Sequence, residues 1–183
     1  MARESRQYGG VAKLLHWAVA LLVLASLVYA WSLPRRSAPD YGDVLLWHKS
    51  LGIAVLVLVA LRLLWRIGNP VAPAATLTPF EAAVSRATHA LLYVTMLVLP
   101  LTGYLFSSLE GQHLALFGLV DLGSPFATDR DLSRPIEAVH KVGQWAVYIL
   151  VGLHALAALY HHFVKRDGVL ARMLPMAGAS EGD

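Results

Sequence analysis

The stretch VGQWAVYILVGLHALAALYHHFV, residues 142 to 164, decides the class of fold. It contains no Asp, Glu, Lys or Arg. At about 1.5 Å per residue, a helix of this length crosses the roughly 30 Å hydrocarbon core of a bilayer. His154 lies inside the run, where an unpaired imidazole would be costly. The stretch therefore predicts a transmembrane helix that carries a functional polar group.

Three further segments have the same apolar character. The second contains Lys49 and Arg62 near its ends, where their long stems can reach an interface. Proline-containing capping signals precede the third and fourth segments and extend their helices beyond the membrane. We therefore expect an all-α, single membrane domain over residues 1–183, a bundle of four transmembrane helices. The expected helices cover about 10–34, 43–67, 79–109 and 133–166, with an outer loop at 110–132.

Composition excludes several classes of protein. Apolar residues make up 57% of the chain and charged residues only 15%, which is too apolar for an ordinary soluble domain. The net charge of +3 reflects membrane orientation, and no nucleic-acid partner is expected. Without cysteine there is no disulfide, thiolate-bound zinc, iron–sulfur cluster or covalently attached haem. Any metal must therefore be bound by His, Met or oxygen.

The distribution of Lys and Arg predicts the orientation. Nine of the 15 fall on the side of the termini and the second connection, and the opposite side is diluted by acidic residues. Both termini are expected to be cytoplasmic, and the first apolar run is too long for a signal-peptide core. The nine are Arg3, Arg6, Lys13, Arg62, Arg66, Arg86, Lys165, Arg166 and Arg172.

Two local sequence features predict irregular structure in the third helix and a short helix in the outer loop. Pro100 and Gly103 should bend the third helix or free a carbonyl for another partner. The apolar residues 114–120 are expected to form a short helix along the outer interface.

The histidines suggest two metal sites at different depths in the membrane. His140 and His154 are separated by about 21 Å of helical rise and only about 40° of rotation, so they share a face. His16 matches the depth of His154, and His48 matches that of His140. Each pair can hold the iron of a flat macrocycle as a six-coordinate centre, which favours electron transfer over oxygen binding. Other pairings remain open, and His16 or His48 taken alone also fits a polar interfacial residue.

The remaining histidines have plainer interpretations. His89 is expected to be interfacial or hydrogen-bonding, and His113 to be solvated in a loop. His161 returns to nearly the same face as His154, about 10 Å closer to the cytoplasm. It could exchange a proton with a quinone and hydrogen-bond to it, although an interfacial role is the simpler reading for His161 and for His162.

Four segments of the sequence resemble the bacterial cytochrome b561 family along essentially the whole chain. They are KLLHWAVALLVL (13–24), HKSLGIAVLVLVALRLLWR (48–66), LPLTGYLFSS (99–108) and VHKVGQWAVYILVGLHALAALYHHFVKRDGVLARMLP (139–175). The resemblance implies a dihaem protein of the bacterial inner membrane with two non-covalent b haems. It places the axial ligands on His16 with His154, for an inner haem, and on His48 with His140, for an outer one.

The resemblance also implies an activity, that of an oxidoreductase that takes electrons from periplasmic superoxide and reduces ubiquinone. Outer-side cations could attract the anion, although outer carboxylates oppose them. These cations are Arg35, Arg36, Lys49, Arg130, Arg134 and Lys141.

Two alternatives remain open at this stage. The same fold could be a cytochrome subunit that passes electrons between quinone and a dehydrogenase or hydrogenase. Alternatively, the histidines could line the path of a proton or metal-ion transporter. Transporters often carry broken helices in corresponding positions, and here only one such position is found, at Pro100 and Gly103.

Overall fold

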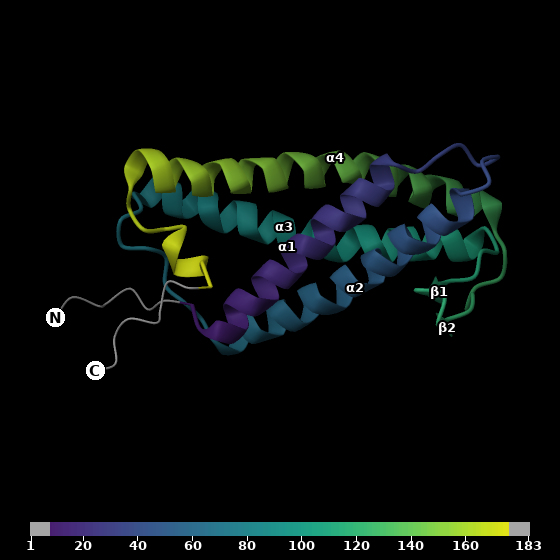
Figure 1. The fold of residues 1–183 in the computed structure, drawn as a ribbon, viewed down its shortest axis with the longest axis horizontal. Helices are drawn as coiled ribbons and strands as arrows, with labels where there is room; N and C mark the ends of the chain where they lie inside the picture. The colour runs from purple at the N-terminus through teal and green to yellow at the C-terminus, as the bar shows by residue number, and fades with distance from the viewer. Residues whose placement is uncertain (1–7, 176–183) are drawn as a thin grey trace.

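The structure is a computed structural model, and it describes residues 8–175. Arg3 and Arg6, which entered the count of basic residues, lie outside the described residues. Within them, four long helices are joined by three connections, the longest of which, between α3 and α4, contains a two-stranded hairpin (Figure 1). The elements are α1 (Gly10–Trp31), α2 (Tyr41–Gly68), α3 (Pro79–Leu109), β1 (Ala115–Leu116), β2 (Val120–Asp121), α4 (Arg130–Tyr160), the π-helix η1 (His161–Lys165) and the 3-10 helix η2 (Ala171–Met173).

All four helices are long and apolar enough to cross a membrane. Large apolar side chains point away from the bundle: Leu21 and Leu64 are each 66% exposed, and Leu156 is 64% exposed. Such an apolar surface would be a liability in water, whereas lipid tails solvate it. The expected class, a multi-pass membrane bundle of four helices, is confirmed.

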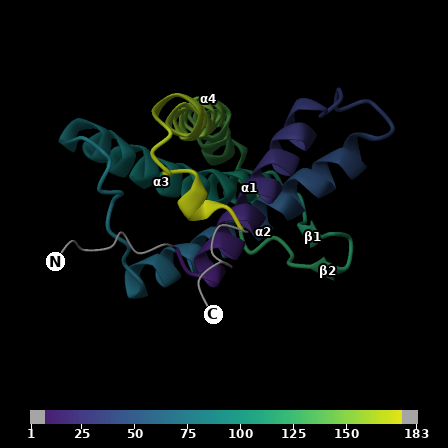
Figure 2. The same cartoon turned by 60° about the vertical axis from the view of Figure 1, so that its left-hand side comes forward.

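The bundle consists of two antiparallel pairs, α1 with α2 and α3 with α4 (Figures 1 and 2). The pair α1 and α2 crosses the other pair obliquely, and α2 also packs against α3. Neither α1 nor α2 packs closely against α4. A cluster of buried valines joins the helices at mid-height: Val19, Val23, Val55, Val59 and Val147.

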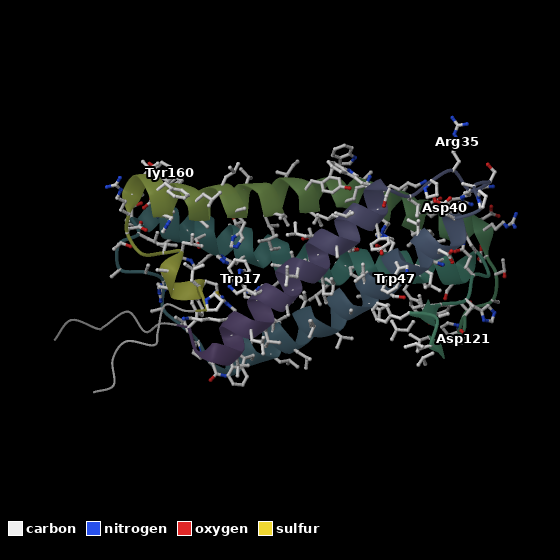
Figure 3. All side chains as sticks on the ribbon, in the orientation of Figure 1. Trp17, Arg35, Asp40, Trp47, Asp121 and Tyr160 are labelled. Atoms are coloured by element: carbon white, nitrogen blue, oxygen red, sulfur yellow. The ribbon has the colours of Figure 1, made fainter. Side chains whose placement is uncertain are left out.

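The two ends of the bundle differ. The hairpin end holds β1, β2 and the α1–α2 connection, whereas the C-terminal end holds η1, η2 and the α2–α3 connection. Figure 3 shows Arg35, Asp40 and Asp121 at the hairpin end and Tyr160 at the C-terminal end. The segment after α4 is tied to the bundle, because the Trp17 Nε1–H donates to the Met173 carbonyl at 2.9 Å.

Side-chain caps fix the starts of α3 and α4. The expected capping box is present: the Thr78 hydroxyl accepts from the Glu81 N–H at 3.3 Å, and the Glu81 carboxylate accepts from the Thr78 N–H at 2.9 Å. The fourth helix begins at Arg130, three residues before its expected start at Ser133. Its cap is Asp129, whose carboxylate accepts from two backbone N–H groups of the first turn.

The expected interfacial helix over residues 114–120 is wrong. The chain forms the hairpin of β1 and β2 there, and the Leu122 N–H donates to the Leu114 carbonyl at 2.8 Å. Phe117 and Gly118 both have positive φ, 51° and 72°, which reverses the chain and excludes an α-helix. The Phe117 N–H donates to the buried Ser50 hydroxyl at 2.8 Å, which fastens the turn to α2.

The Asp129 cap can be tested by substitution. Asp129→Ala leaves the Asp131 and Leu132 N–H groups without their acceptor and should lower the free energy of unfolding by about 1 kcal/mol. Chemical unfolding of the purified protein in detergent would measure it. Asp131→Ala is the control, because that side chain is 97% exposed and caps nothing. Equal stability of the two variants would contradict the role of the cap.

Candidate functional site

The structure brings His48 and His140 together at the hairpin end. Their ring centroids are 6.3 Å apart and their planes are inclined at 83°. The His48 Nδ1–H donates to the Ser26 carbonyl at 3.1 Å, and the His140 Nδ1–H donates to the Leu99 carbonyl at 2.9 Å. Each ring is thereby oriented through Nδ1, which leaves Nε2 as the atom that can bind a metal.

His16 and His154 meet in the same way toward the C-terminal end. Their ring centroids are 6.1 Å apart, with an interplanar angle of 72°. His89 also approaches His154, at 5.1 Å between centroids, and its Nδ1–H donates to the Ser85 carbonyl at 2.6 Å. His89 is therefore a hydrogen-bonding residue, one of the two roles expected for it.

The spacing of the two pairs suits a metal between the rings. An imidazole nitrogen binds a first-row metal at about 2 Å, and the ring centre lies about 1 Å behind it, so two imidazoles on opposite sides of one ion have centroids about 6 Å apart. Both pairs have this separation, whereas His89 and His154 are too close for it. Within residues 8–175 no group of three or more His, Cys, Asp or Glu residues could hold a metal ion, so each pair would supply two ligands only.

Two cavities meet at the hairpin-end pair. Both are lined by His48, His140, Gly52 and Pro100, and the larger has about 640 Å³ of free space, part of it open to the outside. Its other walls are mainly apolar and come from all four helices. A Cβ at Gly52 would meet no atom within 4 Å, so this glycine faces open space. A flat apolar group standing between the imidazoles fits these walls.

Gly103 and Pro100 shape the same site from α3. A Cβ at Gly103 would lie only 2.9 Å from Cε1 of His140, so the imidazole fits only because this position is a glycine. The carbonyl that receives the His140 Nδ1–H belongs to Leu99, which directly precedes Pro100. The carbonyl that loses its helical partner at Pro100 is that of Met96, four residues earlier, so the expectation that Pro100 frees a carbonyl stays a prediction.

The two imidazole pairs are separated by the valine cluster. Val147 of that cluster lies halfway between His140 and His154 on α4, and the two histidines are about 21 Å apart along the helix axis. An apolar layer without charged groups therefore divides the bundle into two levels.

Polar groups surround the cavity on the hairpin side. The Lys49 ammonium, which lines the second cavity, donates to the Gln112 amide oxygen at 2.6 Å, and the Gln112 amide donates to Glu110 at 2.8 Å. Two other cations at this end, Arg36 and Lys141, are paired with carboxylates. Arg36 lies 3.9 Å from Glu110 and 3.8 Å from Glu137. Lys141 lies 2.7 Å from Glu137.

One cation lies beside the other pair. The Arg62 guanidinium lies over the Tyr93 ring, 5.4 Å from its centroid, and is close enough to His16 and His154 to interact with both electrostatically. The Tyr93 hydroxyl is buried and has no hydrogen-bond partner among residues 8–175. Together these groups could hold an anionic substituent of a molecule bound between His16 and His154.

His113 and His162 occupy exposed positions. His113 lies in the loop, as expected, and its Nδ1–H donates to Asp121 at 3.3 Å. The pKa of Asp121 is lowered by the Gly123 N–H and by His113. His162 packs edge-on against Phe163, with ring centroids 4.7 Å apart. Neither residue approaches the two imidazole pairs.

His161 is not at an open interface. It is only 9% exposed, and its Nδ1 lies 2.5 Å from a carboxylate oxygen of Asp167. Sequence reasoning missed Asp167, because the two residues are six positions apart and only a π-helix followed by a reversal brings them together. The positive φ of Arg166, which favours glycine, left no sequence signal for that reversal.

Comparisons with known proteins agree with the fold. Residues 7–176 match the family model described as prokaryotic cytochrome b561. The chain is 30% identical over 179 residues to cytochrome b561 homolog 2 of Escherichia coli, covering 96% of this chain and 95% of that protein. It is 33% identical over 171 residues to a Yersinia pestis protein named probable superoxide oxidase CybB, covering 88% and 92%.

A third relative is cytochrome b561 homolog 1 of Escherichia coli, 32% identical over 169 residues, which cover 88% of this chain and 93% of the relative. The family carries electrons in membranes, and its name implies b-type haem. The chain therefore belongs to the prokaryotic cytochrome b561 family of membrane electron-transfer proteins.

Proposed function

We propose that this protein binds two b haems and carries electrons through them from superoxide on the periplasmic side to ubiquinone. The observation that supports it most strongly is the pair of imidazole contacts, each about as wide as one metal ion requires. His48 and His140 would hold the haem at the hairpin end, and His16 and His154 the other. Arg62 and Tyr93 would bind a carboxylate of the latter haem.

Haem would supply the one-electron redox chemistry, and the protein would bind it, orient its ligands and exclude water. His16, His48, His140 and His154 would hold the two haem irons, two histidines to each. The Ser26 and Leu99 carbonyls orient the rings of His48 and His140. The valine cluster keeps water and charge out of the layer between the two levels.

The ligand assignment predicts which haem each substitution removes. His48→Ala or His140→Ala should remove the hairpin-end haem, and His16→Ala or His154→Ala the other, so each variant should retain one haem per chain. Haem quantitation of the purified proteins would measure this. His113→Ala is the matched control, because this exposed histidine lies in the loop and pairs with Asp121. Retention of two haems in all four variants would refute the assignment.

Gly103→Ala should act on the hairpin-end haem alone. The added Cβ would collide with the His140 ring, displace it from its partner and weaken haem binding about tenfold or more. Titration of haem into the apoprotein would measure the affinity at each level. Gly42→Ala, where a Cβ meets nothing within 4 Å, should bind haem normally. Normal binding by both variants would show that the ring does not need this space.

The orientation in the membrane follows from charge. Of the described Lys and Arg residues, seven lie at the C-terminal end and six at the hairpin end, where carboxylates accompany Arg36 and Lys141. The positive-inside rule then supports a bacterial inner-membrane protein with cytoplasmic termini and a periplasmic hairpin end. The cations at the C-terminal end are Lys13, Arg62, Arg66, Arg86, Lys165, Arg166 and Arg172.

Superoxide is supported as donor by one relative's name and by the cavity at the hairpin end. Lys49 places a cation in the wall of the cavity that both imidazoles also line, where it can attract a small anion. Two superoxide anions would be oxidised to oxygen, and their two electrons with two protons would reduce one ubiquinone to ubiquinol. His161, near the other haem, is the candidate hydrogen-bond partner of the quinone.

Steady-state superoxide consumption with a short-chain ubiquinone analogue as acceptor tests this function. Lys49→Gln should lower the second-order rate constant about threefold to tenfold and weaken its dependence on ionic strength. Lys141→Gln is the control, since that ammonium is exposed and paired with Glu137. A haem-replete wild-type protein that consumes no superoxide, and instead co-purifies with a cofactor-bearing dehydrogenase or hydrogenase, would contradict superoxide as the donor.

A further inference from the structure

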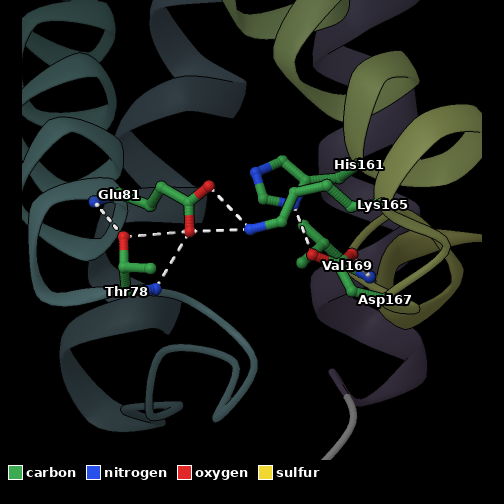
Figure 4. A network of polar contacts seen from close by, with 6 residues as sticks. All are labelled: Thr78, Glu81, His161, Lys165, Asp167 and Val169. Carbon is green, nitrogen blue, oxygen red and sulfur yellow. Dashed lines mark hydrogen bonds and ion pairs between the residues drawn. The ribbon is translucent and has the colours of Figure 1, made fainter.

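The chain makes an unusual reversal directly after α4. The π-helix η1 follows α4 without a break, and Arg166 ends it in the left-handed region, with φ at 51° and ψ at 39°. Asp167 is thereby turned back toward the helix, where its carboxylate meets the Nδ1 of His161 (Figure 4). Single-turn π-helices are rare and occur frequently at functional sites.

The contact between His161 and Asp167 is enclosed. The two side chains are only 11% and 8% exposed. The other carboxylate oxygen of Asp167 accepts from the Val169 N–H at 3.2 Å. Burial by itself would raise the pKa of Asp167, but the hydrogen bonds from His161 and Val169 and the nearby Lys165 bring the pKa below its ordinary value. The carboxylate is therefore ionised at neutral pH.

An ion pair ties this segment to α3. The Lys165 ammonium donates to both carboxylate oxygens of Glu81, at 2.7 and 2.9 Å, and Glu81 belongs to the capping box of α3 (Figure 4). The reversal that carries Asp167 is thus held between the ends of two helices. Such support keeps the carboxylate in one position relative to the imidazole.

The hydrogen bond determines which atom of His161 can react. Because an ionised carboxylate can only accept, Nδ1 carries the proton in the contact. Nε2 is then the atom that exchanges protons, because Nδ1 is engaged with the carboxylate. A carboxylate that accepts from Nδ1–H also stabilises the ring when Nε2 is protonated.

His161 lies where a proton donor is needed if ubiquinone is reduced at this end. It is seven positions beyond His154, about 10 Å further along nearly the same helix face. Reduction of a quinone takes two protons in addition to two electrons, and the hydrocarbon core supplies none. A buried imidazole close to the membrane surface can deliver one of them, and water at the surface the other.

We propose that Asp167 is the positioning residue of the quinone site, holding His161 so that Nε2–H donates a proton to the quinone carbonyl oxygen. This inference rests on the proposed function. For each quinone, two electrons would arrive one at a time from the haem that His154 would hold. His161 passes one proton to the carbonyl oxygen that it faces, and the other carbonyl oxygen takes its proton from water at the C-terminal end. Water at that end then reprotonates Nε2. The two carbonyl oxygens become hydroxyls, and no bond forms to the protein.

The charges around His161 determine how proton delivery depends on pH. Asp167 faces it from the reversal, Lys165 belongs to the same π-helix, and Glu81 approaches through Lys165 from α3. The Tyr160 ring packs edge-on against it. Without Asp167 the imidazole should deliver protons less effectively, most of all at high pH, where protons in the surrounding water are scarce.

The test follows the reoxidation of reduced haem by a short-chain ubiquinone analogue in stopped flow, between about pH 5.5 and 8.5, a range that brackets the ordinary titration of histidine. Asp167→Asn should slow reoxidation about tenfold to a hundredfold above neutral pH, with a smaller deficit at acid pH. Haem content and reduction by superoxide should be unchanged, and Asp167→Glu should recover much of the rate. Asp121→Asn, which alters the exposed pair with His113, should match the wild type.

Two results would overturn the proposal in distinguishable ways. If quinone does not reoxidise the haems of the wild-type protein, the proposed function fails and the inference with it. If quinone reoxidises the wild type but Asp167→Asn has the same rate and pH profile, the inference alone is wrong. A deficit that does not vary with pH, or that accompanies loss of haem, would show that Asp167 is only structural.

Discussion

The arrangement of the four helices depends on two pairs of imidazoles, each of which joins α4 to a helix that does not pack closely against it. His140 and His154 extend from α4 to partners on α2 and α1, and neither of these helices packs closely against α4. Four imidazoles in a bilayer would be costly without partners, and a metal between each pair would satisfy their nitrogens. The spacing of the four helices is then a consequence of what must fit between the rings.

Each end of the bundle supplies groups that surround one of the two imidazole pairs. The hairpin end supplies carbonyls for Nδ1 of both rings, a glycine where His140 needs room and a cavity with Lys49 in its wall. The C-terminal end supplies Arg62, Tyr93 and the enclosed pair of His161 and Asp167. Between them the valine cluster is purely apolar, so charge and protons are confined to the ends.

Regular periodicity made much of this predictable. Helix length, the capping box at Thr78 and the shared face of His140 and His154 follow from 3.6 residues per turn and the thickness of a bilayer. Irregular backbone was not predictable in the same way. The hairpin at residues 114–122 depends on positive φ at Phe117, and Asp167 reaches His161 only through a π-helix and a left-handed Arg166, none of which has a periodic signal.

The most direct test of the central claim is electron paramagnetic resonance of the oxidised, purified protein together with its haem-to-polypeptide ratio. The nearly perpendicular imidazole planes, at 83° and 72°, predict two strongly anisotropic low-spin ferric signals and two haems per chain. A colourless protein, a single haem, or high-spin iron with an open axial position would contradict it.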